Sequence, residues 1–113
     1  MIKQLKVAEL QFLSQAGLTH VFDRRVLSHQ TMQDAALAEE ILNLFLGQID
    51  RLEKADWSSL ELPFEMHTLQ GAAAVMGAHQ IVQLTDSWKK QGTGLERKLK
   101  LAFAQFRTAA ENA

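Results

Sequence analysis

Apolar residues recur every three or four positions along most of this 113-residue chain, which is the spacing typical of helices with one buried face. Val, Ile and Thr never cluster in alternating runs, and the chain contains one proline and six glycines, so a sheet is not expected. The pattern predicts an all-α fold, an antiparallel up-and-down four-helix bundle with one or two short additional N-terminal helices. We expect one domain over residues 1–113, with residues 1–18 as an N-terminal extension or extra helix.

Capping residues divide the first half of the pattern into helices. An amphipathic stretch at residues 3–16 ends near Gly17, and Asp23 is a suitable N-cap for a short helix. Asp34 is a natural N-cap for a long helix over about residues 34–54. The apolar stripe of that helix consists of Ala38, Ile41, Leu42, Phe45, Ile49 and Leu52.

The next helix is expected to start after Ser58 or Ser59, since either residue is a good cap, and to run to about Met76. Pro63 then lies in or beside the first turn, where a missing N–H costs least. Gly77 follows as a residue able to adopt the left-handed conformation that ends a helix.

Two further helices complete the prediction. One runs over about residues 78–91, is followed by a turn at 92–94, and brings together Ile81, Leu84 and Trp88. The last helix directs inward Leu95, Leu99, Phe103, Phe106 and Ala110. The residues expected to fill or pack against the core are Met32, Met66, Met76, Trp57 and Trp88.

Composition narrows the classes of function. Twelve Lys and Arg face thirteen Asp and Glu, for a net charge of −1, which argues against nucleic-acid binding driven by bulk charge. The absence of cysteine excludes disulfides, zinc fingers, iron–sulfur sites and thiol catalysis. No apolar run approaches the ~18 residues of a membrane span, and charges interrupt the N-terminal region where a signal peptide would be apolar. We therefore expect a cytoplasmic protein without membrane contact.

One helix face is not explained by packing. In the helix over about 59–76 the core stripe consists of Leu62, Met66, Leu69, Ala73 and Met76. His67 points away from that stripe, and Phe64, Gly71 and Ala74 lie within about 60° of it around the helix. A glycine inside a helix costs ~1 kcal/mol relative to alanine. Small residues around an exposed histidine favour a docking site for another macromolecule, although an ordinary surface histidine and a glycine at a helix contact remain an alternative.

The string from His67 to Ala78, HTLQGAAAVMGA, resembles the signature of histidine-containing phosphotransfer domains. That family shows His-x-Leu-Lys-Gly, then small residues, then Gly-Ala about ten positions after the histidine. The stretch from Ile41 to Leu46 resembles the family's Leu-Leu-x-x-Phe helix, and Phe22-Asp23 resembles its short leading helix. The resemblance covers roughly residues 20–108.

The resemblance implies a phosphoryl carrier in a multistep two-component phosphorelay. His67 would accept a phosphoryl group through Nε2 from the aspartate of one receiver domain and donate it to another. The residues implied to support the phosphoryl group are Gln70, Gly71 and Ala74. The partner would dock on Phe64 and on the antiparallel neighbouring helix, through Leu37, Leu44 and Gln48.

The same resemblance limits what the chain does alone. It implies that the chain binds no metal or cofactor, because the Mg²⁺ belongs to the receiver. It also implies no kinase activity of its own, since no nucleotide motif is present, so whether the chain counts as an enzyme stays open. The chain is either a stand-alone carrier or, slightly favoured on family grounds, the C-terminal domain of a hybrid sensor kinase.

This sequence departs from the family at Gln70, where a lysine is usual. The resemblance implies that this lysine holds the phosphoryl group and steers the acidic partner, whereas Gln70 donates hydrogen bonds without a charge. Lys89 or Lys90 is a candidate replacement.

Two alternatives to the carrier stay open. One is a pseudo-carrier that binds a receiver without accepting phosphate, and the other is a helical adaptor or metal-binding bundle. The remaining histidines are not four residues from His67, which gives a helical metal site little support; they are His20, His29 and His79.

Overall fold

The computed structural model describes residues 20–91 and 94–111, and within these ranges every regular element is an α-helix. The helices are α2 (Arg24–Gln30), α3 (Ala35–Glu53), α4 (Leu62–Met76), α5 (His79–Gln91) and α6 (Glu96–Glu111). The prediction of an all-α fold is confirmed for this part of the chain. The expected N-terminal extension and the first two residues of the turn expected at 92–94 lie outside the described residues. No described helix is long and apolar enough to cross a membrane.

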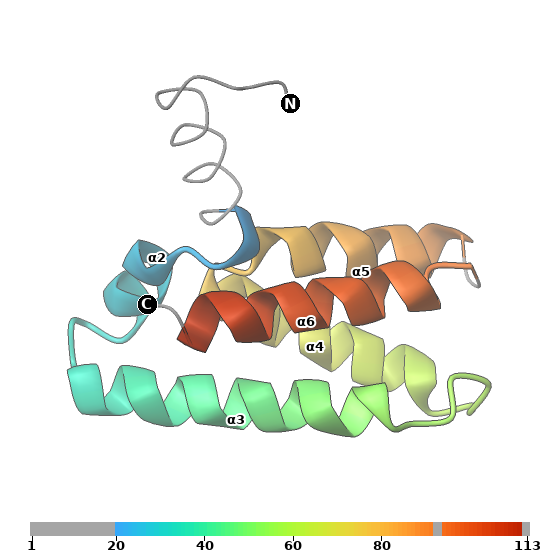
Figure 1. Cartoon of the computed structure of the whole chain (residues 1–113), viewed down its shortest axis with the longest axis horizontal. Coiled ribbons are helices and arrows are strands. Elements are labelled where there is room, and N and C mark those ends of the chain that lie inside the picture. The colour runs from blue at the N-terminus through green and yellow to red at the C-terminus, as the bar shows by residue number, and fades with distance from the viewer. Residues whose placement is uncertain (1–19, 92–93, 112–113) are drawn as a thin grey trace, which may run out of the picture.

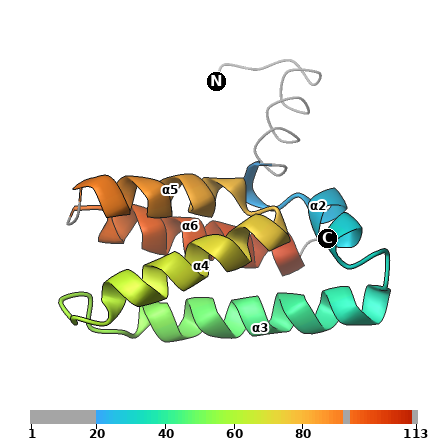
Figure 2. The same cartoon turned by 180° about the vertical axis from the view of Figure 1, so that it is seen from behind.

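The helices α3 to α6 lie side by side, and consecutive ones run in opposite directions (Figure 1). Helix α6 is on the near side in Figure 1 and α4 is on the near side in Figure 2, so these two occupy opposite faces between α3 and α5. Helix α4 contacts α2, α3 and α5, whereas α6 contacts α3 and α5. One face of α4 is therefore left toward solvent.

The predicted stripe of α4 forms the centre of the core. Its five residues are at most 2% exposed: Leu62, Met66, Leu69, Ala73 and Met76. Fully burying a large apolar side chain contributes about 1.5–3 kcal/mol. The other helices add large buried residues to the same cluster: Leu42, Phe45, Ile49, Leu52, Ile81, Leu99, Phe103 and Phe106. The ring centroid of Phe106 lies 4.7 Å from that of Phe22 and 4.9 Å from that of Phe45.

Two predicted N-caps are present. An Asp23 carboxylate oxygen accepts a hydrogen bond from the Arg25 backbone N–H at 3.0 Å, and Asp34 accepts one from the Leu37 N–H at 3.0 Å. Each bond satisfies one of the backbone donors that a helix leaves unpaired at its start. The sequence-based starts of α2 and α3 are confirmed.

The predicted start of α4 is wrong. Neither Ser58 nor Ser59 caps the helix, which begins at Leu62 with Glu61 at the N-cap position and no side-chain cap. The serines instead stabilise the preceding turns, because Ser58 donates to Asp56 at 2.7 Å and Ser59 accepts from the Glu61 N–H at 3.1 Å. Pro63 lies in the first turn, as expected.

Gly77 ends α4 in the left-handed conformation, with φ 76° and ψ 25°. The backbone N–H of Ala78 donates to Ala73 at 2.9 Å, and that of Gly77 to Ala74 at 3.2 Å. A Cβ added to Gly77 would lie 2.5 Å from the Asp23 carbonyl oxygen, so the position excludes a side chain by space as well as by φ. The Asp23 N–H donates to the Gly77 carbonyl at 2.9 Å, which joins the start of α2 to the end of α4.

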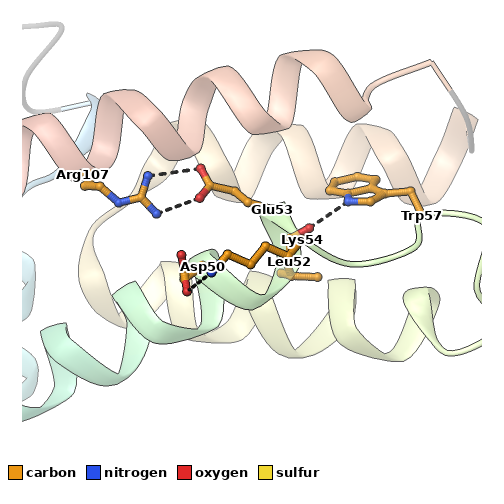
Figure 3. A network of polar contacts seen from close by, with 6 residues as sticks. All are labelled: Asp50, Leu52, Glu53, Lys54, Trp57 and Arg107. Carbon is orange, nitrogen blue, oxygen red and sulfur yellow. Dashed lines mark hydrogen bonds and ion pairs between the residues drawn. The ribbon is translucent and has the colours of Figure 1, made fainter.

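Polar contacts connect the end of α3 to its neighbours (Figure 3). Arg107 of α6 donates to both carboxylate oxygens of Glu53, at 2.9 and 3.2 Å, and both side chains are partly buried. The Trp57 indole N–H donates to the Leu52 carbonyl at 2.9 Å. Trp57 thus packs against the core as predicted and satisfies one carbonyl at the end of α3.

Of the three methionines predicted to fill the core, Met66 and Met76 do so, but Met32 is 88% exposed. Met32 and Gln33 both have positive φ, 54° and 64°, in the turn between α2 and α3. This turn directs Met32 into solvent, because the chain must reverse before Asp34 starts α3. Hydrophobicity alone does not reveal such a turn.

Candidate functional site

His67 lies in the second turn of α4 and is exposed. Its neighbour Met66 is fully buried, as is Leu69 two positions later, so the register of the helix turns the imidazole away from the core. The core side of α4 is set by its apolar stripe, and the position of His67 follows from that stripe. The imidazole is thus exposed to solvent on a helix whose other face is fixed in the core.

The surface beyond His67 is smooth. Gly71, one turn later, is exposed, and a Cβ built on it would meet no atom within 4 Å. Ala74 is exposed one further turn along, and Phe64, one turn before His67, is 73% exposed. Gly71 is therefore not required by a close helix contact, which removes the packing explanation for a glycine at this position.

Helix α5 brings a cation to the imidazole. The Lys89 ammonium nitrogen lies 3.2 Å from Nδ1 of His67 and donates to Oε1 of Gln70 at 2.6 Å. Gln70 in turn donates from Nε2 to the Val82 carbonyl at 3.3 Å. These contacts bridge α4 and α5, which run side by side (Figure 2).

Lys90, the other cation considered from the sequence, has a different partner. Its ammonium lies 3.2 Å from the Asp86 carboxylate on the same helix. Of the two lysines, Lys89 is therefore the one that contacts His67 and Gln70. The sequence carries a signal for a lysine at this height, because His67 and the Lys89-Lys90 pair lie at nearly equal distances from the Gly77–Ala78 turn along antiparallel helices. The choice between the two lysines comes from their contacts.

The residues expected to dock a partner from the neighbouring helix are all on α3, and they differ in exposure. Leu44 is 68% exposed, Leu37 is 40% exposed, and Gln48 is partly buried. Leu37 lies in the first turn of α3, seven residues and so about 10 Å before Leu44. Leu44 and Phe64 are thus the most exposed large apolar side chains described on α3 and α4, and Leu37 is displaced toward the α2 end.

The other described histidines do not join the site. His79, which opens α5, is exposed and acts electrostatically on Asp23. The hydrogen bond from the Arg25 side chain is the main reason that the pKa of Asp23 is lowered, and the charge of His79 adds to it. His20 and His29 are exposed. Among residues 20–91 and 94–111, no three His, Cys, Asp or Glu side chains form a group that could hold a metal.

Comparison of this chain with protein-family models, with curated proteins and with solved structures found no match.

Proposed function

We propose that this chain is a phosphoryl carrier of a multistep two-component phosphorelay, with His67 as the residue that is phosphorylated. In this proposal α3 to α6 form the antiparallel up-and-down four-helix bundle of a histidine-containing phosphotransfer domain. The observation that carries it is the surroundings of His67: an exposed imidazole, an open surface at Gly71, and an ammonium 3.2 Å from Nδ1.

The proposed chemistry is two successive displacements at phosphorus. Nε2 of His67 attacks the phosphoryl group of a receiver's aspartyl phosphate, so that an N–P bond forms while the acyl P–O bond breaks. The electron pair of that bond leaves with the aspartate carboxylate. A carboxylate oxygen of a second receiver then attacks phosphorus, and the pair of the N–P bond returns to the ring. Such reactions require positioning and charge neutralisation above all.

Lys89 supports the charge neutralisation. The position three residues after the histidine holds Gln70, which brings no charge, but the Lys89 ammonium from α5 lies beside both side chains. A flexible lysine stem allows the ammonium to reach the phosphoryl oxygens of the incoming aspartyl phosphate during transfer. The Mg²⁺ and the acidic pocket belong to the receiver in this proposal.

The receiver docks over the exposed face of α4, where Gly71 and Ala74 allow close approach and Phe64 and Leu44 offer apolar contact. Gln48, which is partly buried, and Leu37, in the first turn of α3, contribute less to this contact in the proposal. The proposal includes a cytoplasmic setting, receiver domains rather than nucleic acid or membrane as partners, and attachment to a hybrid sensor kinase as one arrangement.

Phosphotransfer from a phosphorylated receiver to the wild-type chain and to His67→Gln tests the proposal. We expect acid-labile label on the wild type and none on the variant, with equal helical circular dichroism for both. Label that persists on a folded His67→Gln protein excludes His67 as the acceptor. Binding of a receiver without label on the wild type would instead identify a pseudo-carrier, the reading that the uncharged Gln70 favours.

A further inference from the structure

The groups around His67 can be assigned as hydrogen-bond donors or acceptors one after another. Because Nε2 of Gln70 donates to the Val82 carbonyl, the amide oxygen of Gln70 faces the ammonium of Lys89 and accepts from it. An ammonium group carries donors and no acceptor, so Nδ1 of His67 accepts from Lys89 at 3.2 Å. A neutral imidazole whose Nδ1 accepts has its proton on Nε2. Lys89 thus covers Nδ1, and Nε2 is the ring nitrogen left for a partner.

We propose that Lys89, held in place by Gln70, is a positioning residue that keeps Nδ1 of His67 unprotonated and so prolongs the lifetime of a phosphoryl group on Nε2. This inference rests on the proposed function, because it concerns the same histidine once it is phosphorylated. In this inference Gln70 holds the Lys89 ammonium in place and does not itself contact the phosphoryl group.

The chemistry of the N–P bond supplies the reason. In hydrolysis a water oxygen bonds to phosphorus, the N–P bond breaks, and its electron pair goes to Nε2 while the water loses a proton to solvent. When Nδ1 already carries a proton, the ring leaves as neutral imidazole; otherwise it leaves as an anion, which is unfavourable. An ammonium next to Nδ1 opposes protonation there. A unit charge at about 4 Å in water changes such an equilibrium by about fivefold.

The same lysine need not block transfer. Attack by Nε2 requires that its proton leave and that Nδ1 be free to take one, so the Lys89 ammonium must release Nδ1 in the complex. Phosphoryl oxygens of the incoming aspartyl phosphate are stronger acceptors than a neutral ring nitrogen. Lys89 is exposed, on a flexible stem. It moves to those oxygens during transfer and returns to Nδ1 when the receiver departs.

Several charged groups on the helices around α4 are paired with one another. The ion pairs are Arg25 with Asp23 beside α2, Lys54 with Asp50 at α3, Arg107 with Glu53 between α6 and α3, and Lys90 with Asp86 on α5. Further titratable groups on these helices and on α4 itself are Arg24, His29, Glu39, Glu40, Arg51, Glu65 and His79. Among the described residues, the charged group in contact with the His67 ring is the Lys89 ammonium.

The experiment loads the whole chain chemically with phosphoramidate, a small phosphoryl donor that bypasses the receiver. The decay of phospho-His67 is followed by ³¹P NMR at neutral pH, and His67→Gln identifies signals from the other histidines. Wild type is compared with Lys89→Gln and Lys89→Arg. Lys90→Gln is the matched control, since it makes the same charge change one residue away, at an exposed lysine.

We expect Lys89→Gln to shorten the half-life about two- to fivefold, with Lys89→Arg and Lys90→Gln close to wild type. Adding Gln70→Lys to Lys89→Gln returns a charge from α4 and lengthens the half-life again. In the unphosphorylated chain, the ¹⁵N shift of Nδ1 changes in Lys89→Gln and not in Lys90→Gln. Equal half-lives in all variants, or an unchanged Nδ1 shift, overturns the inference about Lys89 while leaving receiver-dependent labelling of His67, and so the carrier proposal, intact. Failure of labelling by receivers, with these lifetime differences present, contradicts the carrier proposal alone.

Discussion

Substitutions at Gly71 test whether this glycine is needed for folding or for the binding of a partner to the exposed face of α4. Replacement by alanine adds one methyl group, which meets no atom within 4 Å. Alanine is more favourable than glycine inside a helix by about 0.5–1 kcal/mol. We therefore expect Gly71→Ala to stabilise the isolated chain by about that amount, equivalent to about 2–4 °C in Tm for a domain of this size.

Urea unfolding followed by circular dichroism measures this difference. The midpoint should rise without a change in slope, because the surface exposed on unfolding hardly changes. A lower midpoint for Gly71→Ala would refute the reasoning, since it would mean that the backbone or a neighbour at Gly71 cannot accept a methyl group.

Gly71→Leu separates the partner from the fold. Leucine is also a better helix former than glycine, so the free chain stays folded, but the larger side chain stands beside His67 on the proposed docking face. Receiver binding or phosphotransfer should fall at least tenfold. Ala104→Leu places the same side chain on an exposed position of α6 and serves as the control, where binding should stay unchanged. Equal activity of both variants would place docking on another face.

Two further predictions concern the core and the α2 cap. Leu69→Ala removes a fully buried side chain and should destabilise the chain by about 2–5 kcal/mol in urea titrations, whereas Leu101→Ala, at a 59% exposed position, should change stability by less than about 0.5 kcal/mol. The lowered pKa of Asp23, caused chiefly by its hydrogen bond from Arg25, means that its carboxylate stabilises the fold above its ordinary pKa and that this contribution is lost as pH falls through the lowered value. Asp23→Asn keeps a capping side chain, so its deficit relative to wild type should be present at pH 7, begin to shrink below about pH 4 and disappear only below the lowered pKa of Asp23; a deficit that persists unchanged in acid would contradict the charge argument.

The parts of the fold that follow from local chemistry were predictable. The stripe of α4, the caps Asp23 and Asp34 and the left-handed Gly77 each depend on residues within one or two helical turns. The start of α4 was not predictable, because Ser58 and Ser59 suit turns as well as caps. Their turn contacts determine that neither serine caps the helix.

The candidate site was also predictable only in part. The exposure of His67, Gly71 and Ala74 follows from the helical period of α4 alone. The choice of Lys89 over Lys90 depends on the register of α5 against α4 and on the Asp86 partner of Lys90. Likewise, the separation of Leu37 from Leu44 follows from the tertiary arrangement of α3. Periodicity identifies which residues share a face, and packing between helices determines which faces meet.

The division of the site between two helices has a consequence for how such sites are found. A histidine and a lysine three residues apart on one helix form a motif that can be read in a string of letters. Here the imidazole and its ammonium are 22 positions apart and meet only when α4 and α5 are packed together. A peptide of α4 alone would keep the histidine and lose the cation. A pattern search that requires the lysine beside the histidine would pass over this chain.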